Sequence, residues 1–177
     1  MEIDQILVIK MIFFRMVFTW SSKTLLQSLK NFQISQPRGA PWPEDLSLGI
    51  FLEQLSSSQN MFQRTGGVHA SGLFDYDGNL ICLREDVGRH NALDKVVGWS
   101  LDKQFVPAKD TILLVSGRIS FELVQKALLA GIPNLVGIGA PSSLAIELAE
   151  EFDLTLLGFL RENSVNVYSG DWRIGRL

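Results

Sequence analysis

The sequence has few of the residues that bind metals or form disulfides. Among its 177 residues there is one cysteine, Cys82, and there are two histidines, His69 and His90. A single cysteine excludes an intrachain disulfide, which fits a reducing compartment. A zinc site needs three or four cysteine, histidine or carboxylate ligands at set spacings, so we predict no metal site. Cys82 stands in the apolar run of residues 80–83 and is interpreted as a small buried hydrophobic residue rather than a nucleophile.

Positive charge is also scarce. The 16 lysines and arginines are outnumbered by 19 aspartates and glutamates, which gives a net charge of -3 and a pI of about 5.4. This balance argues against a chain-wide surface for nucleic acid and leaves a local anion site open. The apolar stretch of residues 6–20 contains Lys10 and Arg15 and is shorter than the roughly 20 residues of a membrane-spanning helix. We expect buried strands there and no membrane span, with a membrane-surface segment as the alternative.

Composition divides the chain near residue 40. Residues 1–20 are apolar, residues 21–33 have the pattern of a short amphipathic helix, and three prolines and a glycine between residues 36 and 43 mark a linker. We therefore predict an N-terminal segment, a remnant or divergent domain, at 1–40 and a second domain at 41–177. The length suits one domain of usual size that builds its core without disulfides.

From residue 44 on, the hydrophobic pattern becomes regular. Apolar residues at helical spacing predict a helix over 45–62, and alternating residues around a turn at 75–79 predict a β-hairpin. Continuous apolar runs predict strands buried on both faces. The remaining predicted elements are helices around 92–99, 121–130 and 143–152 and strands at 111–115, 134–138, 154–159 and 165–168.

The order of these elements predicts the fold. Two successive strand–helix–strand units imply parallel strands with right-handed crossovers, and the hairpin before them implies an antiparallel part. We predict an α/β protein, a three-layer α/β/α sandwich with a mixed sheet.

Two loops that follow buried strands are candidates for ligand contact, since open α/β sheets bind ligands beyond the carboxyl ends of their strands. Residues 116–120 and 139–143 each lead into a helix, whose free backbone N–H groups and dipole favour an anion. Arg118 adds a planar group suited to phosphate. Neither loop matches a P-loop or the G-x-G-x-x-G motif, and serine caps helices in many proteins. A structural role is therefore the alternative.

Three further segments carry polar residues. Residues 158–164 end the third strand, where Arg161 and Asn163 are placed to contact a phosphate or a base edge, or else form a hairpin turn. Residues 84–91 contain two arginines, two carboxylates, a histidine and an asparagine around a glycine, which predicts either a polar pocket or a structural ion network. Gly66 and Gly67 allow close approach of a ligand to the backbone, and His69 is either a proton-transfer group or a structural histidine.

Five segments, taken in order, resemble the FdhD family of formate dehydrogenase accessory proteins: residues 65–69, 84–95, 116–122, 140–145 and 166–168. The resemblance covers roughly residues 46–174. It implies a fold similar to that of cytidine deaminases. The chain has neither the His-x-Glu nor the Pro-Cys-x-x-Cys motif with which zinc deaminases hold and use their metal.

The resemblance also implies a function. Members of the family are cytoplasmic sulfurtransferases that take sulfur from a cysteine desulfurase and pass it to the Mo-bis(molybdopterin guanine dinucleotide) cofactor, or its tungsten equivalent, before insertion into formate dehydrogenase. A homodimer is implied, with GDP as a partial mimic of the cofactor. The cofactor-contacting segment of the family falls on residues 159–164. The predicted cofactor-binding residues are Phe159, Leu160, Arg161, Glu162, Asn163, Ser164, Gly66, Gly67, His69, Asp86, Arg89, His90, Asn91, Ser116, Gly117, Arg118, Ser142 and Ser143.

The chain departs from the family at the cysteines. Family members carry persulfide sulfur on a Cys-x-x-Cys loop, whereas residues 19–25 near its expected place contain serine and no cysteine. The chain is then either truncated or a natural variant without the loop. Three hypotheses follow: a cofactor platform of a sulfurtransferase, a non-catalytic cofactor-binding chaperone, or an unrelated hydrolase that uses His69 or His90 with the carboxylates of residues 84–91. The missing cysteines favour the chaperone over the transferase, and the long resemblance disfavours the hydrolase.

Overall fold

The computed structural model describes Trp42 and residues Ser47–Ile174. These residues belong to a compact unit that spans Gln36–Leu177. The strands, helix and domain boundary predicted for residues 1–40 lie outside the described residues, as does most of the predicted linker.

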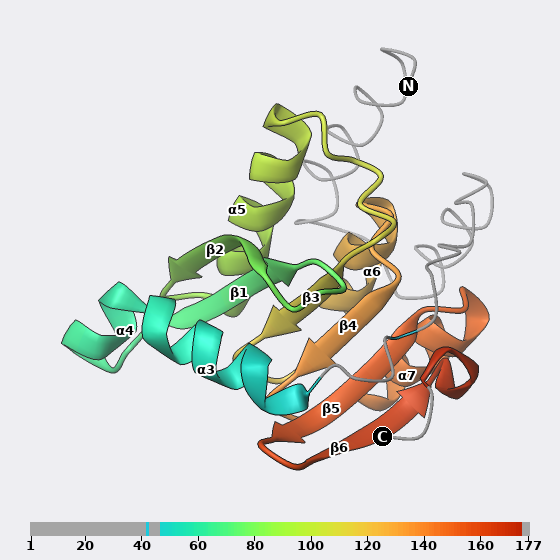
Figure 1. Cartoon of the computed structure of the whole chain (residues 1–177). Coiled ribbons are helices and arrows are strands. Elements are labelled where there is room, and N and C mark those ends of the chain that lie inside the picture. The colour runs from blue at the N-terminus through green and yellow to red at the C-terminus, as the bar shows by residue number, and fades with distance from the viewer. Residues whose placement is uncertain (1–41, 43–46, 175–177) are drawn as a thin grey trace. The chain divides into compact units, whose positions relative to one another are not determined.

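A six-stranded mixed sheet forms the middle of the described domain, with strand order β2-β1-β3-β4-β5-β6 (Figure 1). Strands β3, β4 and β5 run parallel, while β1 is antiparallel to both of its neighbours and β6 is antiparallel to β5. The strands are β1 His69–Phe74, β2 Leu80–Asp86, β3 Ile112–Val115, β4 Asn134–Gly137, β5 Thr155–Arg161 and β6 Ser164–Ser169.

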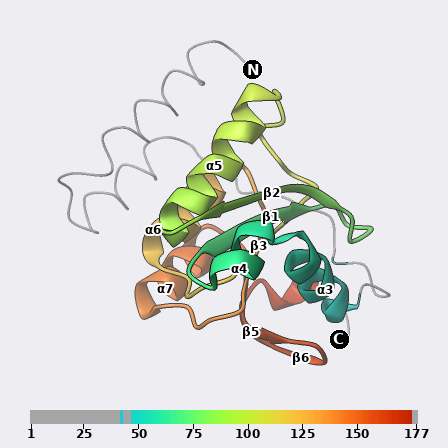
Figure 2. The same cartoon turned by 90° about the vertical axis from the view of Figure 1, so that its left-hand side faces the viewer.

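Helices cover both faces of this sheet (Figures 1 and 2). Helix α3 lies across one face, and helices α5, α6 and α7 lie against the other. The helices are α3 Leu48–Ser58, α4 Asn60–Thr65, α5 Arg89–Asp102, α6 Phe121–Leu129 and α7 Ser143–Glu151, followed at the C-terminal end by the 3-10 turn η1 Asp171–Arg173. The predicted α/β fold with a mixed sheet and helices on both faces is thus confirmed. Its likeness to cytidine deaminases stays a prediction.

The core beneath α3 contains three aromatic rings in contact. Phe51 is fully buried and its ring meets those of Trp42 and Phe74 edge-on, with centroids 5.8 and 5.0 Å apart. Edge-to-face pairs of this kind add stability beyond the area that they bury. Trp42 is 3% exposed, so the residue that the sequence places in a linker is part of the core. None of the described helices is long and apolar enough to cross a membrane.

Two predicted elements have different bounds in the structure. The single helix predicted over 45–62 is wrong, because α3 ends at Ser58 and α4 begins at Asn60. The Glu85 carboxylate accepts the backbone N–H groups of Met61 and Phe62, at 2.9 Å each, and so supports a new helix start. Glu85 belongs to β2, so the hydrophobic pattern of residues 45–62 gives no sign of this contact.

The second difference concerns the turn predicted over 158–164. Strand β5 continues to Arg161 and β6 begins at Ser164, so only Glu162 and Asn163 form the turn. Phe159 has a positive φ of 56°, and the register between β5 and β6 shifts across it. Such a bulge lets pairing continue beyond an irregular residue. The hairpin, which was the alternative for this segment, is the observed structure.

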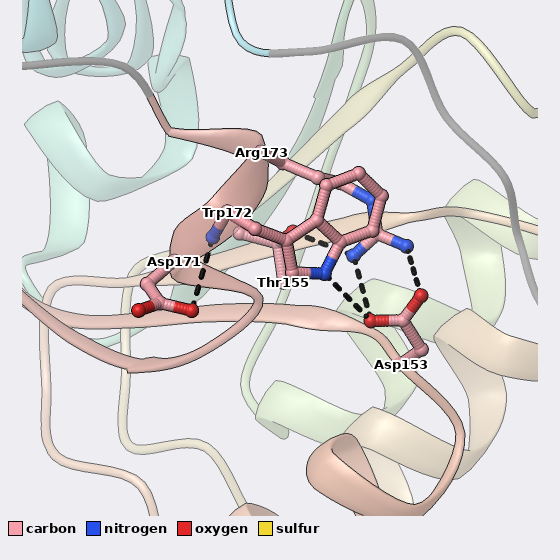
Figure 3. Close-up of polar contacts among 5 residues, drawn as sticks. All are labelled: Asp153, Thr155, Asp171, Trp172 and Arg173. Carbon is pink, nitrogen blue, oxygen red and sulfur yellow. Dashed lines mark hydrogen bonds and ion pairs between the residues drawn. The ribbon is translucent and has the colours of Figure 1, made fainter.

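A cluster of polar contacts holds the C-terminal turn against the start of β5 (Figure 3). We call it the C-terminal clasp, formed by Asp153, Thr155, Trp172 and Arg173. The fully buried Arg173 guanidinium contacts Asp153 Oδ2 at 2.7 Å and donates to Thr155 Oγ1 at 3.2 Å. Trp172 donates its indole N–H to Asp153 Oδ1 at 3.1 Å, and its ring lies 4.0 Å from the guanidinium carbon.

Candidate functional site

The direction of the strands brings the predicted site segments to one edge of the sheet. Strands β3, β4 and β5 all end there, and β1 begins there because it is antiparallel to β3. In the register, His69 pairs with Asp86 and Ser71 pairs with Val115, so β2 also ends at this edge. Helix α5 then starts there with Arg89 and His90. We call this edge, with the loops that follow β3 and β4, the strand-tip site.

Main-chain hydrogen bonds join the loops after β3 and β4. Gly139 donates its N–H to the Gly117 carbonyl at 3.2 Å, and Ile119 donates to the Ala140 carbonyl at 3.0 Å. Ser142 in turn donates to the Ile119 carbonyl at 2.9 Å. The two loops are therefore one connected surface rather than independent turns.

Strand β5 attaches to the same surface. Phe159 donates its N–H to the Gly139 carbonyl at 3.2 Å, and Arg161 Nη1 donates to the Ile138 carbonyl at 3.1 Å. All three predicted loop segments thus meet at one edge. This is the arrangement that a shared binding site requires.

Gly139 makes this junction sterically possible. A Cβ atom at Gly139 would lie 2.8 Å from the backbone nitrogen of Arg118 and 2.9 Å from the carbonyl carbon of Gly117. Both atoms belong to the main chain and cannot turn aside as a flexible side chain does. The close approach of the two loops therefore requires glycine here.

His69 and Arg89 converge over Gly117. A Cβ atom added at Gly117 would lie 3.3 Å from His69 Nδ1 and 3.6 Å from Arg89 Cδ. Ser116 Oγ accepts the N–H of Ala70 at 2.9 Å and lies 3.5 Å from His69 Nδ1. The structure thus places an imidazole and a guanidinium group beside the loop after β3.

Arg89 has a buried donor without a partner. Its Nε is shielded from solvent and makes no hydrogen bond within the described part of the chain. An unsatisfied buried donor costs about 1–3 kcal/mol. An anion at the strand-tip site would supply the missing acceptor, so this side chain fits a phosphate group.

His90 follows Arg89 in α5 and contacts the start of α6. His90 Nε2 is 3.0 Å from Ser120 Oγ and 3.8 Å from Glu122 Oε2. Burial lowers the pKa of His90 below its usual 6.5, and the nearby positive charges of Arg89 and Lys126 act in the same direction. Glu122 and Asp94 oppose this shift and do not reverse it. The imidazole is therefore mainly neutral at neutral pH.

The other polar residues of the 84–91 segment form a structural network. Asp86 Oδ2 is 2.7 Å from Lys95 Nζ, and Asp86 Oδ1 accepts from the Gly88 N–H and from Asn91 Nδ2. The hydrogen bonds from Lys95, Gly88 and Asn91 lower the pKa of Asp86 to about 2. The segment therefore divides: Asp86 binds Asn91 and Lys95, while Arg89 and His90 lie toward the strand tips.

Other predicted site residues have different surroundings. Ser142 Oγ accepts the Ala145 N–H at 3.3 Å and caps α7, which is the structural alternative for that serine. Gly66 ends α4 with a positive φ of 63°. The Leu160 side chain is fully buried in the core, so only its backbone is available to a ligand. The exposed members of the predicted set include Gly67, Arg118, Ser143, Phe159 and residues 161–164.

Cys82 lies in the middle of β2, opposite Leu73, and is buried as predicted. Burial raises the pKa of its thiol, and the positive charge of Arg84 only partly opposes this. The thiol is therefore protonated at neutral pH and shielded from reagents. Within the described residues, no three His, Cys, Asp or Glu side chains are grouped so that they could hold a metal ion.

The predicted loops 116–120 and 139–143 contain Ser120 and Gly139, but the sequence assigned no individual role to Ser120, Glu122 or Gly139. His90 and Ser120 are separated by 30 positions, and the need for glycine at 139 arises only from the approach of another loop. The one local signal in the sequence that could have pointed to Ser120 was its position where the loop after a strand leads into a helix.

The described domain is thus an α/β sandwich with a basic and imidazole-bearing site at the tips of its parallel strands. Residues 22–175 match the FdhD/NarQ family. The chain therefore belongs to the FdhD/NarQ family, and the resemblance seen in the sequence is confirmed.

Relatives and a solved structure agree with this membership. The chain is 60% identical over 120 residues to the sulfur carrier protein FdhD of Nocardia farcinica, covering 68% of this chain and 43% of that protein. It is 48% identical over 153 residues to the FdhD protein of Mycobacterium tuberculosis, covering 86% and 55%. A crystal structure of a formate dehydrogenase accessory protein from Desulfotalea psychrophila is similar, with a TM-score of 0.67, 31% identity and coverage of 79% and 61%. The chain spans about half the length of the curated relatives it matches.

Proposed function

We propose that the described domain is a binding platform for a guanine-dinucleotide cofactor of molybdenum or tungsten that is destined for formate dehydrogenase. In this proposal the cofactor is cargo, and its diphosphate lies at the strand-tip site. A homodimer in the cytoplasm is the proposed working form. The names of the relatives, sulfur carrier protein FdhD and formate dehydrogenase accessory protein, support the choice of cargo and recipient.

The convergence of Arg89, His69 and the loop after β3 is the observation that carries this proposal. Among the described residues the Nε of Arg89 has no acceptor, and the loop backbone approaches both side chains closely. A planar guanidinium group next to backbone N–H groups at a helix start suits a phosphate oxygen. GDP contains the guanine and the diphosphate of the cofactor and is the simplest ligand with which to test the site.

The hydrolase hypothesis has less support from the same geometry. The carboxylates of Glu85 and Asp86 bind backbone N–H groups, Asn91 and Lys95 rather than an imidazole. Glu122 lies near Nε2 of His90, the same nitrogen that faces Ser120. A serine–histidine–carboxylate triad needs the acid at the opposite ring nitrogen.

We propose that this polypeptide does not itself carry sulfur, because that would require a reactive cysteine and none of its residues at the strand-tip site is a cysteine. Cys82 is the single cysteine and is buried in β2. We therefore propose that this chain binds the cofactor, and that sulfur transfer from a cysteine desulfurase needs cysteines other than Cys82.

Incubation with a cysteine desulfurase and cysteine is expected to leave Cys82 without added sulfur. The thiolate is the reactive form, and burial both raises the pKa of Cys82 and blocks access. Intact-protein mass spectrometry, compared with the protein unfolded in urea and treated with an alkylating reagent, measures this. A persulfide on Cys82 in the folded protein would mean that the chain carries sulfur itself.

Substitution of Arg118 or Arg161 by alanine is expected to weaken GDP binding by about 1–3 kcal/mol each, as the loss of a charge-assisted contact does. Both side chains are exposed at the strand-tip site, where a phosphate would meet them. Calorimetry with GDP measures the effect. Lys109→Ala is the matched control, because Lys109 is exposed and precedes β3, at the opposite edge of the sheet. Unchanged affinity in both arginine variants would remove the strand-tip assignment.

A further inference from the structure

The charges around His90 are arranged so that an added anion would change its protonation state. From its own helix α5 it is faced by Arg89 and Asp94, and from α6 by Lys126 and Glu122. Asp94 is held by Lys126 at 2.6 Å, and the Glu122 side chain is 57% exposed to water. The imidazole therefore lies next to an arginine whose buried Nε has no acceptor within the described residues.

One hydrogen bond and one longer ionic contact orient this ring. Ser120 Oγ lies 3.0 Å from Nε2, and the Glu122 carboxylate lies 3.8 Å from the same nitrogen. In the described residues Nε2 thus has an oxygen to donate to, whereas Nδ1 forms no bond that would hold a proton. An oriented ring with one open nitrogen can take up a proton without rearrangement of the helices around it.

We propose that His90 takes up a proton from solution when a nucleoside diphosphate diester occupies the strand-tip site, and that the ligand is bound to the imidazolium form. This inference rests on the proposed function. The step adds one proton to Nδ1 of a neutral imidazole and breaks no covalent bond. The diphosphate brings negative charge toward Arg89 and His90, which offsets the burial and the repulsion from Arg89 and Lys126 that lower the pKa of His90 without ligand.

Linkage fixes the direction of the pH effect. The pKa of His90 is higher with ligand bound than without it, so affinity is greatest at low pH and falls as pH rises through the pKa of the bound state. Below the pKa of the free state both forms are already charged, and binding takes up no proton. Proton uptake is therefore confined to the interval between the two values, which begins below pH 6.5 because the free pKa is lowered.

Calorimetry in two buffers tests the proposal. The ligand is diguanosine diphosphate, two guanosines joined by a 5′,5′-diphosphate, which has no phosphate group that titrates near neutral pH, unlike GDP. At pH 7 we expect the binding heat to differ between buffers of different ionisation enthalpy, corresponding to uptake of a fraction of one proton. We also expect the affinity to fall several-fold between about pH 6 and pH 8.

Two variants assign the proton to a residue. His90→Gln keeps a side-chain N–H that can reach Ser120 and is expected to abolish both the buffer dependence and the fall in affinity with pH. His69→Gln removes the other histidine of the chain and is expected to retain proton uptake even where its affinity changes.

The outcomes separate this inference from the proposed function. No binding of diguanosine diphosphate to the unmodified protein would overturn both. Binding with a heat that is the same in both buffers, or uptake that persists in His90→Gln, would overturn the role of His90 and leave the cofactor platform standing.

Discussion

Replacement of Arg173 by methionine is expected to lower the free energy of unfolding by about 3 kcal/mol, the lower end of the range for removing one partner of a buried ion pair. Arg173 is fully buried, and its partner Asp153 would keep its charge without a counter-ion. The Asp153 side chain is 34% exposed, so water recovers part of the loss. The ring of Trp172, 4.0 Å from the guanidinium carbon, would lose its cation as well.

A double-mutant cycle separates charge from packing in the C-terminal clasp. Asp153→Asn is the suitable partner substitution, because Asp153 has a positive φ of 54° and asparagine tolerates that region. The double variant Asp153→Asn, Arg173→Met leaves no unpaired charge and is expected to be more stable than Arg173→Met alone. Urea denaturation at neutral pH measures all four proteins. A loss below about 1 kcal/mol in Arg173→Met would mean that the buried pair contributes no more than an exposed one.

Substitution of Gly139 by valine is expected to destabilise the domain by about 3 kcal/mol and to weaken GDP binding by about 100-fold or more, since overpacking against backbone forces the main chain to move. The first side-chain atom would lie 2.8 Å from the Arg118 nitrogen. Relief requires the loops after β3 and β4 to separate, which breaks their shared hydrogen bonds and displaces Arg118.

Gly98→Val is the matched control for this change. Gly98 lies in α5, is exposed, and a Cβ atom there would meet nothing within 4 Å. Valine is a somewhat better helix former than glycine, so stability is expected to change by less than about 0.5 kcal/mol. Calorimetry with GDP and urea denaturation of both variants provide the comparison. Full GDP affinity in a folded Gly139→Val protein would show that the junction of the loops is not needed for binding.

The sequence predicted the layout of the site because strand direction follows from element order. Apolar runs at 111–115 and 134–138 with helices between them require parallel pairing, and parallel strands end at one edge. The predicted loops at 116–120 and 139–143 therefore had to be neighbours, and the structure joins them by main-chain hydrogen bonds.

What the sequence did not predict depends on contacts between distant residues. The break between α3 and α4 follows from Glu85, 23 and 24 residues from the N–H groups that it accepts. The continuation of β5 to Arg161 follows from a bulge at Phe159 and from pairing with β6. The division of the 84–91 segment into a network and a site follows from Lys95, in the second turn of α5. The local hydrophobic pattern of each segment contains no information about these distant contacts.

The loops after β3 and β4 are held together by backbone atoms, and this has a consequence for how the family can change. The main-chain hydrogen bonds among these loops and β5 do not depend on which side chains are exposed at the strand-tip site. Exposed positions such as Arg118 and Ser143 are thus interchangeable without rebuilding the scaffold beneath them. Substitutions at such exposed positions can therefore change the ligand of the strand-tip site while the backbone of its loops stays the same. This holds as long as Gly139 is kept where the two loops meet.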